Sequence, residues 1–191
     1  MSRRGRLTAQ REAELYEAVL DLLGAYGYET VTVDALSARA GMSKATMYRH
    51  WPGKAELVAA ALCHRPLVEL DDINTNSLHG DLRAVASRLD DALLARNAAL
   101  LRGVLNAAGV EPVLREALRV MFAEAPAVGL EGILRRAIAR GELPPDSPAL
   151  GFVPHALIGA MLTHPLIKGG PAGQGFISDY LEYVLLPALC R

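Results

Sequence analysis

Eight consecutive residues gather hydroxyl and cationic side chains of the kind that bind phosphates and nucleotide bases. They read Ser-Lys-Ala-Thr-Met-Tyr-Arg-His over residues 43–50. The three hydroxyl groups and the cations Lys44 and Arg49 can donate hydrogen bonds to phosphate oxygens and to base edges. The chemistry expected of this stretch is therefore the reversible binding of a polyanion.

The elements that must position these side chains are two short helices joined by a glycine. Thr32 is a good N-cap for a helix that reaches about Ala40, and Gly41 then breaks the chain. Ser43 caps a second helix, which ends at about His50. Two helices of this length cannot bury their own apolar faces. We therefore expect four residues to pack against longer helices at about residues 8–27 and 54–65: Leu36, Ala40, Met42 and Met47.

The second short helix then protrudes with its polar residues outward, as in a helix-turn-helix that enters the major groove of DNA. Its first turn, residues 43–46, is expected to face base edges, and its last turn is expected to reach phosphates. The outward set is Ser43, Lys44, Ala45, Thr46, Tyr48, Arg49 and His50. The spacing alone fits equally well with a helical hairpin whose polar face is simply solvated.

Lys54 begins the next helix, where a cation opposes the helix dipole by a few tenths of a kcal/mol up to about 1 kcal/mol. The placement becomes favourable if an anion docks on the free amides of that helix end. We therefore expect Lys54 to contact a DNA phosphate. The alternative is an ordinary surface lysine.

Residues 40–57 read Ala-Gly-Met-Ser-Lys-Ala-Thr-Met-Tyr-Arg-His-Trp-Pro-Gly-Lys-Ala-Glu-Leu, which resembles the signature of the TetR/AcrR family of bacterial regulators. The resemblance covers about residues 10–60. It implies phosphate contacts at five positions: Thr32, Thr46, Tyr48, His50 and Lys54. It implies base reading at or beside three positions: Lys44, Ala45 and Arg49. The departures are mild, because Met42, Met47 and Trp51 keep apolar bulk and Gly53 replaces only a polar cap.

The rest of the chain is expected to be helical as well, giving an all-α protein of about nine helices. Polar, irregular residues 66–80 separate a DNA-binding head with its linking helix (residues 1–65) from a ligand-sensing and dimerisation body (residues 66–191). The head carries nine Lys/Arg against seven Asp/Glu, and the body carries eleven against fourteen. A mildly basic head suits a polyanionic partner. Arg3, Arg4 and Arg6 are either a minor-groove arm or a plain basic tail.

The body helices expected at about residues 81–107, 112–123, 128–140, 148–162 and 174–189 match the family only in outline. The resemblance implies that the last two pair with those of a second copy. Gly151, His155 and Gly159 form a small-residue stripe at four-residue steps. This stripe permits close helix approach, either between copies or within one chain.

Apolar and aromatic residues of the body are candidates for an effector pocket. They are Met121, Phe122, Met161 and Tyr183, with Phe152 as a further candidate. Helix breaks expected at Gly103, Gly109 and Pro126 would splay the helices and open a cavity. The competing interpretation is that these residues fill an ordinary core.

Catalysis finds no support, since HExxH, GxSxG and phosphate-binding glycine loops are absent from the sequence. We expect neither an enzyme nor a bound metal or cofactor. Cys63 and Cys190 show no CxxC spacing, which fits the reducing cytoplasm. The uncharged residues 147–167 are long enough for a membrane span, but three prolines and two histidines within them favour a buried helix instead.

The sequence therefore predicts a cytoplasmic homodimer that binds a near-palindromic operator in double-stranded DNA. By the family resemblance it is a repressor released by an unidentified, largely apolar small molecule. Two alternatives stay open: a DNA-binding regulator without a small-molecule effector, and a helical enzyme or carrier that contains a helix-turn-helix-like hairpin.

Overall fold

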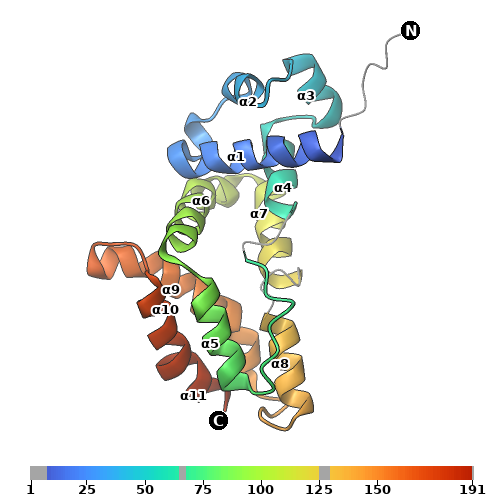
Figure 1. Ribbon diagram of the computed structural model, residues 1–191. Helices are drawn as coiled ribbons and strands as arrows, with labels where there is room; N and C mark the ends of the chain where they lie inside the picture. The colour runs from blue at the N-terminus through green and yellow to red at the C-terminus, as the bar shows by residue number, and fades with distance from the viewer. Residues whose placement is uncertain (1–7, 65–67, 125–129, 191) are drawn as a thin grey trace. The chain divides into compact units, whose positions relative to one another are not determined.

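The computed structural model describes residues 8–64, 68–124 and 130–190, and this part of the chain contains helices but no strand (Figure 1). The predicted all-α fold is therefore confirmed. The chain forms two compact units, one made of residues 1–65 and 99–120 and the other of residues 66–98 and 121–191. A single cut after residue 65 does not describe this division, because residues 99–120 belong with the N-terminal helices. The arginines at positions 3, 4 and 6 lie outside the described residues.

The first unit begins with helices whose starts are fixed by hydroxyl caps. Its elements are α1 (Ala9–Thr30), α2 (Val33–Ala40), α3 (Lys44–His50), α4 (Lys54–Cys63), the second half of α6 (Asp91–Val110) and α7 (Pro112–Arg119). Thr8, Thr32 and Ser43 each accept a hydrogen bond from a backbone N–H three residues on. Gly27 leaves the helical conformation at φ 74°, and Gly41 closes α2 at φ 61°. The predicted caps at Thr32 and Ser43 and the predicted break at Gly41 are thus confirmed.

The core of the first unit is built on α1, which contacts α2 and α4, and α4 in turn contacts α7. Val19 and Leu23 of α1 and Val58 of α4 are fully buried. α6 lies so close to α1 that a Cβ added at Gly103 would fall 2.3 Å from the carbonyl oxygen of Leu23. Only glycine fits such a backbone approach.

The second unit packs its helices around a leucine-rich core. Its elements are α5 (Leu78–Arg88), the first half of α6, α8 (Leu130–Ala139), the 3₁₀ turn η3 (Pro148–Phe152), α9 (Val153–Lys168), α10 (Gln174–Tyr180), the π-helical η4 (Leu181–Leu185) and α11 (Leu186–Leu189). A second π-helical segment, η1 (Val120–Glu124), follows α7. Ile133, Ile177 and Leu189 are among the fully buried side chains of this core.

The structure corrects two expectations about where helices end. The single helix expected over residues 81–107 is two helices, because α5 ends at Arg88 and Asp90 accepts a hydrogen bond from the Leu93 N–H at 2.8 Å to start α6. Gly103 and Gly109 do not break α6, which runs through both. Helix breaks at these glycines are therefore not the source of any cavity. Pro126 lies outside the described residues.

α9 also differs from expectation, since it is not buried. Val153 is the only residue of α9 that is buried, and Leu166 and Ile167 near its end are 86% and 73% exposed. By length and composition alone, residues 148–168 pass as a membrane-crossing helix, and 6% of their most apolar window is buried. One side of α9 packs against the core through half-buried residues such as Leu157 and Met161, while the apolar side chains at its end stay exposed.

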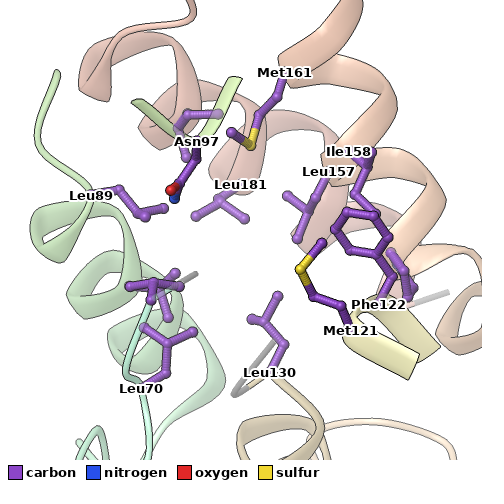
Figure 2. A pocket seen from close by; sticks show the side chains of 14 residues that line it. Leu70, Leu89, Asn97, Met121, Phe122, Leu130, Leu157, Ile158, Met161 and Leu181 are labelled. Carbon is purple, nitrogen blue, oxygen red and sulfur yellow. The ribbon is translucent and has the colours of Figure 1, made fainter. Parts of the chain in front are cut away.

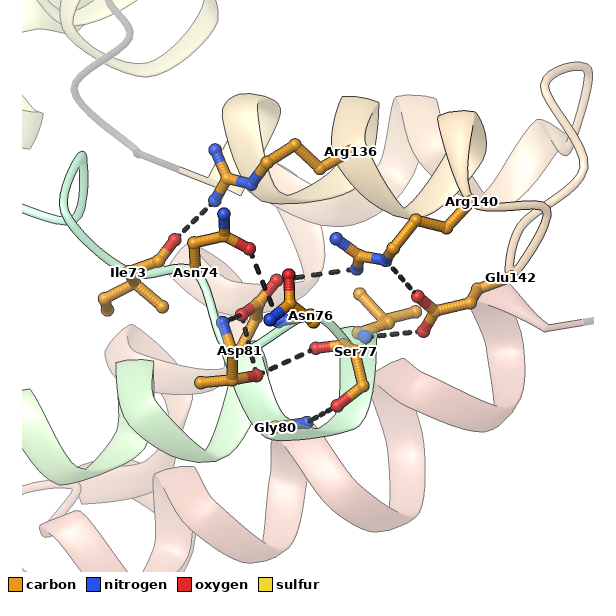
Figure 3. Close-up of polar contacts among 11 residues, drawn as sticks. Ile73, Asn74, Asn76, Ser77, Gly80, Asp81, Arg136, Arg140 and Glu142 are labelled. Carbon is orange, nitrogen blue, oxygen red and sulfur yellow. Dashed lines mark hydrogen bonds and ion pairs between the residues drawn. The ribbon is translucent and has the colours of Figure 1, made fainter.

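A polar network fixes the loop before α5 to the end of α8 (Figure 3). The buried Asp81 accepts hydrogen bonds from the Thr75 N–H at 2.6 Å and from the Thr75 hydroxyl at 2.9 Å. A guanidinium nitrogen of Arg140 lies 3.6 Å from the other Asp81 oxygen. Glu142 forms an ion pair with Arg140. It also accepts a hydrogen bond at 2.5 Å from the Leu78 N–H, at the start of α5. These contacts tie α5, the loop and α8 into one support for the core.

Candidate functional site

The outward face of α3 gathers most of the residues expected to bind DNA. Ser43, Lys44, Ala45, Tyr48, Arg49 and His50 are exposed, and Thr46 is half-buried. Tyr48 is 53% exposed, although its ring is large and largely apolar. An aromatic group left in water on a helix that also carries cations is typical of a binding surface.

The inward side of α3 is anchored from two directions. Met47 is buried, and the Ser37 hydroxyl of α2 lies 2.9 Å from its sulfur. Trp51, directly after α3, meets the Tyr16 ring of α1 edge-on at 5.8 Å between centroids. α3 is therefore held against both neighbours while its polar residues stay free to contact a ligand.

The Thr32 cap retains the ability to donate a hydrogen bond, whereas the Ser43 hydroxyl lies 3.0 Å from the Thr46 hydroxyl and shares a hydrogen bond with it. The Thr32 oxygen accepts from the Ala35 N–H at 3.2 Å, and the Ser43 oxygen accepts from the Thr46 N–H at 3.2 Å. A hydroxyl that accepts at its oxygen still carries a proton that it can donate. Thr32 is exposed at the start of α2, so its proton can reach a phosphate oxygen.

Lys44, expected to read bases, is paired in the free protein. Its ammonium forms an ion pair with the Asp34 carboxylate of α2, and the two side chains are 56% and 64% exposed. An exposed pair of this kind contributes at most about 1 kcal/mol. It can therefore open when a better partner arrives, but it lowers the net positive charge of the face.

Lys54 makes contacts inside the protein that local sequence patterns do not predict. Its ammonium donates to the Tyr28 carbonyl at 2.8 Å and to the Val31 carbonyl at 3.0 Å, and it lies 3.9 Å from the Tyr28 ring centroid. Burial raises the pKa of the Tyr28 phenol, so the ring under the cation stays neutral. The start of α4 is thus fixed to the turn between α1 and α2. The partners lie 23 and 26 residues away, too far for a local pattern to indicate them.

An apolar cavity lies in the second unit, lined by fourteen residues (Figure 2). Met121, Phe122 and Met161 line it, as expected of effector-site candidates. Tyr183 and Phe152 do not line it and are 70% and 66% exposed. The free volume is about 90 Å³, where a water needs at least about 10–15 Å³ by the same measure. The cavity volume is therefore larger than a few water molecules need.

The described part of the second unit also exposes apolar surface to solvent. Among the described residues, a Cβ added at Gly151 or Gly159 would meet no atom within 4 Å, so both glycines of the small-residue stripe face open space. Tyr183 and Val184 of η4 are 70% and 49% exposed. In water, apolar area of this extent favours association.

Comparisons with known proteins cover both units. The family model of bacterial regulatory proteins, tetR family, matches residues 15–61, and that of the tetracyclin repressor-like C-terminal domain matches residues 72–184. An uncharacterized HTH-type transcriptional regulator of Mycobacterium tuberculosis (strain H37Rv) is 34% identical over 182 residues, which cover 95% of this chain and 89% of that protein. The DNA-binding transcriptional repressor TetR of Mycobacteroides abscessus is 33% identical over 177 residues, which cover 92% of each chain.

A solved structure shows the same fold. The crystal structure of a TetR-family transcriptional regulator from Rhodococcus sp. aligns with a TM-score of 0.70 at 16% identity, covering 96% of this chain and 100% of that chain.

Proposed function

Because the chain belongs to the TetR family of transcriptional regulators, we propose that it is a cytoplasmic, homodimeric repressor that leaves its operator when a small apolar molecule binds. Regulators of this family bind DNA and dimerise through the C-terminal domain, and they are not enzymes. The proposal that this chain represses transcription is supported by the Mycobacteroides abscessus relative, which is named as a DNA-binding transcriptional repressor.

The observation that carries DNA binding is the outward face of α3. It presents two cations and an exposed aromatic hydroxyl on a helix narrow enough for the major groove. Lys44 and Ala45 in the first turn are proposed to read bases, as are Ser43 and Thr46 beside them. Tyr48, with the other outward residues of the last turn, is proposed to hold phosphates. Thr32 and Lys54 extend the phosphate contacts to the starts of α2 and α4.

The proposal that two copies associate rests on the apolar surface of α9 and η4. The open Gly159 position lets a second helix approach closely, and the exposed side chains of Leu166, Tyr183 and Val184 supply apolar area on the same two elements. A symmetric dimer places two α3 helices on successive half-sites, one DNA turn of about 34–36 Å apart. The operator is therefore proposed to be nearly palindromic.

The proposal of ligand control rests on the cavity. It is apolar, and two π-helical segments contribute to its lining, Met121 and Phe122 from η1 and Leu181 from η4. Such widened turns inside helices occur frequently at functional sites. A ligand that favours a dimer state with a different spacing between the heads would release the operator.

DNA binding is tested by removing one hydroxyl. Tyr48→Phe should weaken binding to operator and to unrelated duplexes by the same factor, because a phosphate contact carries no sequence information. Tyr26→Phe is the matched control, since Tyr26 is 63% exposed but lies on α1. Equal affinities of wild type and both variants, measured by fluorescence anisotropy across a salt titration, would contradict the phosphate role of Tyr48.

The dimer is tested by filling the open glycine. Gly159→Leu should separate the subunits, because its side chain occupies the space through which the second copy approaches. Gly109→Leu is the control, since that position is equally open but lies in the first unit. Analytical ultracentrifugation that shows a wild-type monomer at micromolar concentration, with or without operator DNA, would refute the dimer. Co-sedimentation of that monomer with lipid vesicles would assign α9 to a membrane instead.

A further inference from the structure

One polar side chain stands among the described residues that line the apolar cavity. Asn97 of α6 is 7% exposed, and the other thirteen lining residues are aliphatic, aromatic, thioether or proline side chains. No charged residue is among those fourteen. The position of this amide, rather than the shape of the apolar wall, is therefore the chemically distinct feature of the site.

Figure 2 shows how Asn97 meets the cavity. Its amide end extends from α6 toward the space beside Leu89 and Leu181, and the sulfur-containing side chain of Met161 lies on the same side. A ligand that fills the cavity would therefore place one of its ends against this amide.

The chemistry of a carboxamide limits what it selects. Asn has two donor hydrogens and an oxygen with two acceptor positions, so one amide can serve a hydroxyl or a carbonyl of a ligand beside its protein contacts. A hydroxyl or carbonyl buried without a partner costs about 1–3 kcal/mol. A carboxylate or an ammonium would be buried without an opposite charge, which costs far more.

The apolar side chains that line the cavity can adapt their conformations, so they put little constraint on the shape of the apolar part of a ligand. Met121 and Met161 have flexible, polarisable side chains that fill irregular spaces. Such a wall accepts different apolar shapes, so discrimination falls to the one polar group.

We propose that the cavity takes an uncharged, largely apolar molecule with a single hydrogen-bonding group, and that Asn97 is the residue that recognises this group. The proposal rests on the assignment of the cavity as an effector site and names the class of effector that the site takes. Sugars, nucleotides and carboxylic acids are excluded as tight ligands.

Three probes with one apolar body test the proposal: n-propylbenzene, 4-propylphenol and 4-propylbenzoate. Their dissociation constants are measured by isothermal titration calorimetry on the full chain, as wild type, Asn97→Leu and Asn106→Leu. Leucine keeps the branched shape of asparagine without its polar atoms. Asn106 is the matched control, because it lies on the same helix, is exposed and does not line the cavity.

The quantity that decides is the ratio of the dissociation constants of 4-propylphenol and n-propylbenzene. In Asn97→Leu this ratio should rise at least about tenfold over wild type, because the phenol hydroxyl loses its partner. In Asn106→Leu it should stay within about twofold of wild type, and the benzoate should show no binding to any of the three proteins. If Asn97→Leu does not fold, the wild-type ranking decides: tightest binding by the benzoate overturns the proposal.

The proposal is also overturned if the ratio in a folded Asn97→Leu changes less than about twofold, or if none of the probes binds wild type. Operator release is measured separately with wild type and 4-propylphenol. An Asn97-dependent ratio without release supports the recognition role and refutes ligand control. Release of the operator by 4-propylphenol, together with a ratio of dissociation constants that Asn97→Leu leaves unchanged, overturns only the recognition role of Asn97.

Discussion

Replacing Gly103 with alanine places a methyl group against the backbone of α1. The added Cβ would lie 2.3 Å from the Leu23 carbonyl oxygen and 3.4 Å from the Gly27 Cα. The Leu23 oxygen belongs to a helix and cannot rotate away as a side chain would. α6 must therefore move about 1 Å from α1, because ordinary contact at a Cβ begins at 3.4 Å.

The magnitude follows from two opposing effects. Overpacking a core costs about 1–3 kcal/mol, and a main-chain obstacle places this site near the upper end. Alanine is favoured over glycine in a helix interior by about 1 kcal/mol. The net loss in the free energy of unfolding is about 2 kcal/mol, which in a chain of 191 residues lowers Tm by about 4–8 °C.

The assay is thermal unfolding followed by the fluorescence of the single tryptophan, Trp51, which is buried in the first unit. Gly109→Ala is the control on the same helix, because its Cβ would meet nothing within 4 Å. The control should keep Tm or raise it slightly. A Gly103→Ala protein with the Tm of Gly109→Ala would refute the close approach of α6 to α1.

Three further predictions concern charges. Lys54→Met should lower the midpoint of thermal unfolding, followed by Trp51 fluorescence. It should also reduce the slope of log affinity against log salt concentration by about 0.9, since one phosphate contact is lost. An unchanged slope would leave Lys54 as a purely structural residue. Asp34→Asn should free Lys44 and tighten DNA binding at low salt, with stability changing by less than about 1 kcal/mol; weaker or equal binding would contradict this role of the pair. The pKa of Glu142 is lowered first by the hydrogen bond from the Leu78 N–H and then by Arg140. The contribution of Glu142 to stability is therefore fully present above the ordinary glutamate pKa of about 4.3, and it is lost as the pH falls through the lowered pKa. Glu142→Gln should therefore flatten the dependence of stability on pH between about 5 and 3, and chemical denaturation at several pH values that gives identical profiles would disprove the linkage.

Local chemistry made the head predictable from the sequence. The caps at Thr32 and Ser43 and the left-handed Gly41 depend on residues within four positions of one another, so their signals are local. The buried face of α3 followed from the position of Met47 in the helical period. The same local reasoning missed Asp90 as the cap of α6, because the flanking residues continue a helical pattern on both sides.

Contacts between distant segments were not predictable in this way. Lys54 finds its carbonyl partners only once α1 and α4 have packed, and the role of Gly103 depends on which helix faces it. Asn97 carries no sequence signal, since a lone asparagine in a helix is usually a surface residue. Treating α9 as a buried helix failed because composition reports only that a face is apolar, and not what covers it.

Two copies of this chain are proposed to read a near-palindromic operator with the outward face of α3. Selection of bound sequences from random DNA duplexes by the full-length wild-type protein tests it most directly. A dimer with two α3 helices should enrich an inverted repeat whose half-sites lie about one helical turn, or 34–36 Å, apart. With Lys44→Ala the preferred bases should change, with effects of about 1–3 kcal/mol at single positions. Operator reading by a dimer would be refuted if no motif is enriched. It would also be refuted if the enriched motif is a single, unrepeated site that stays the same with Lys44→Ala.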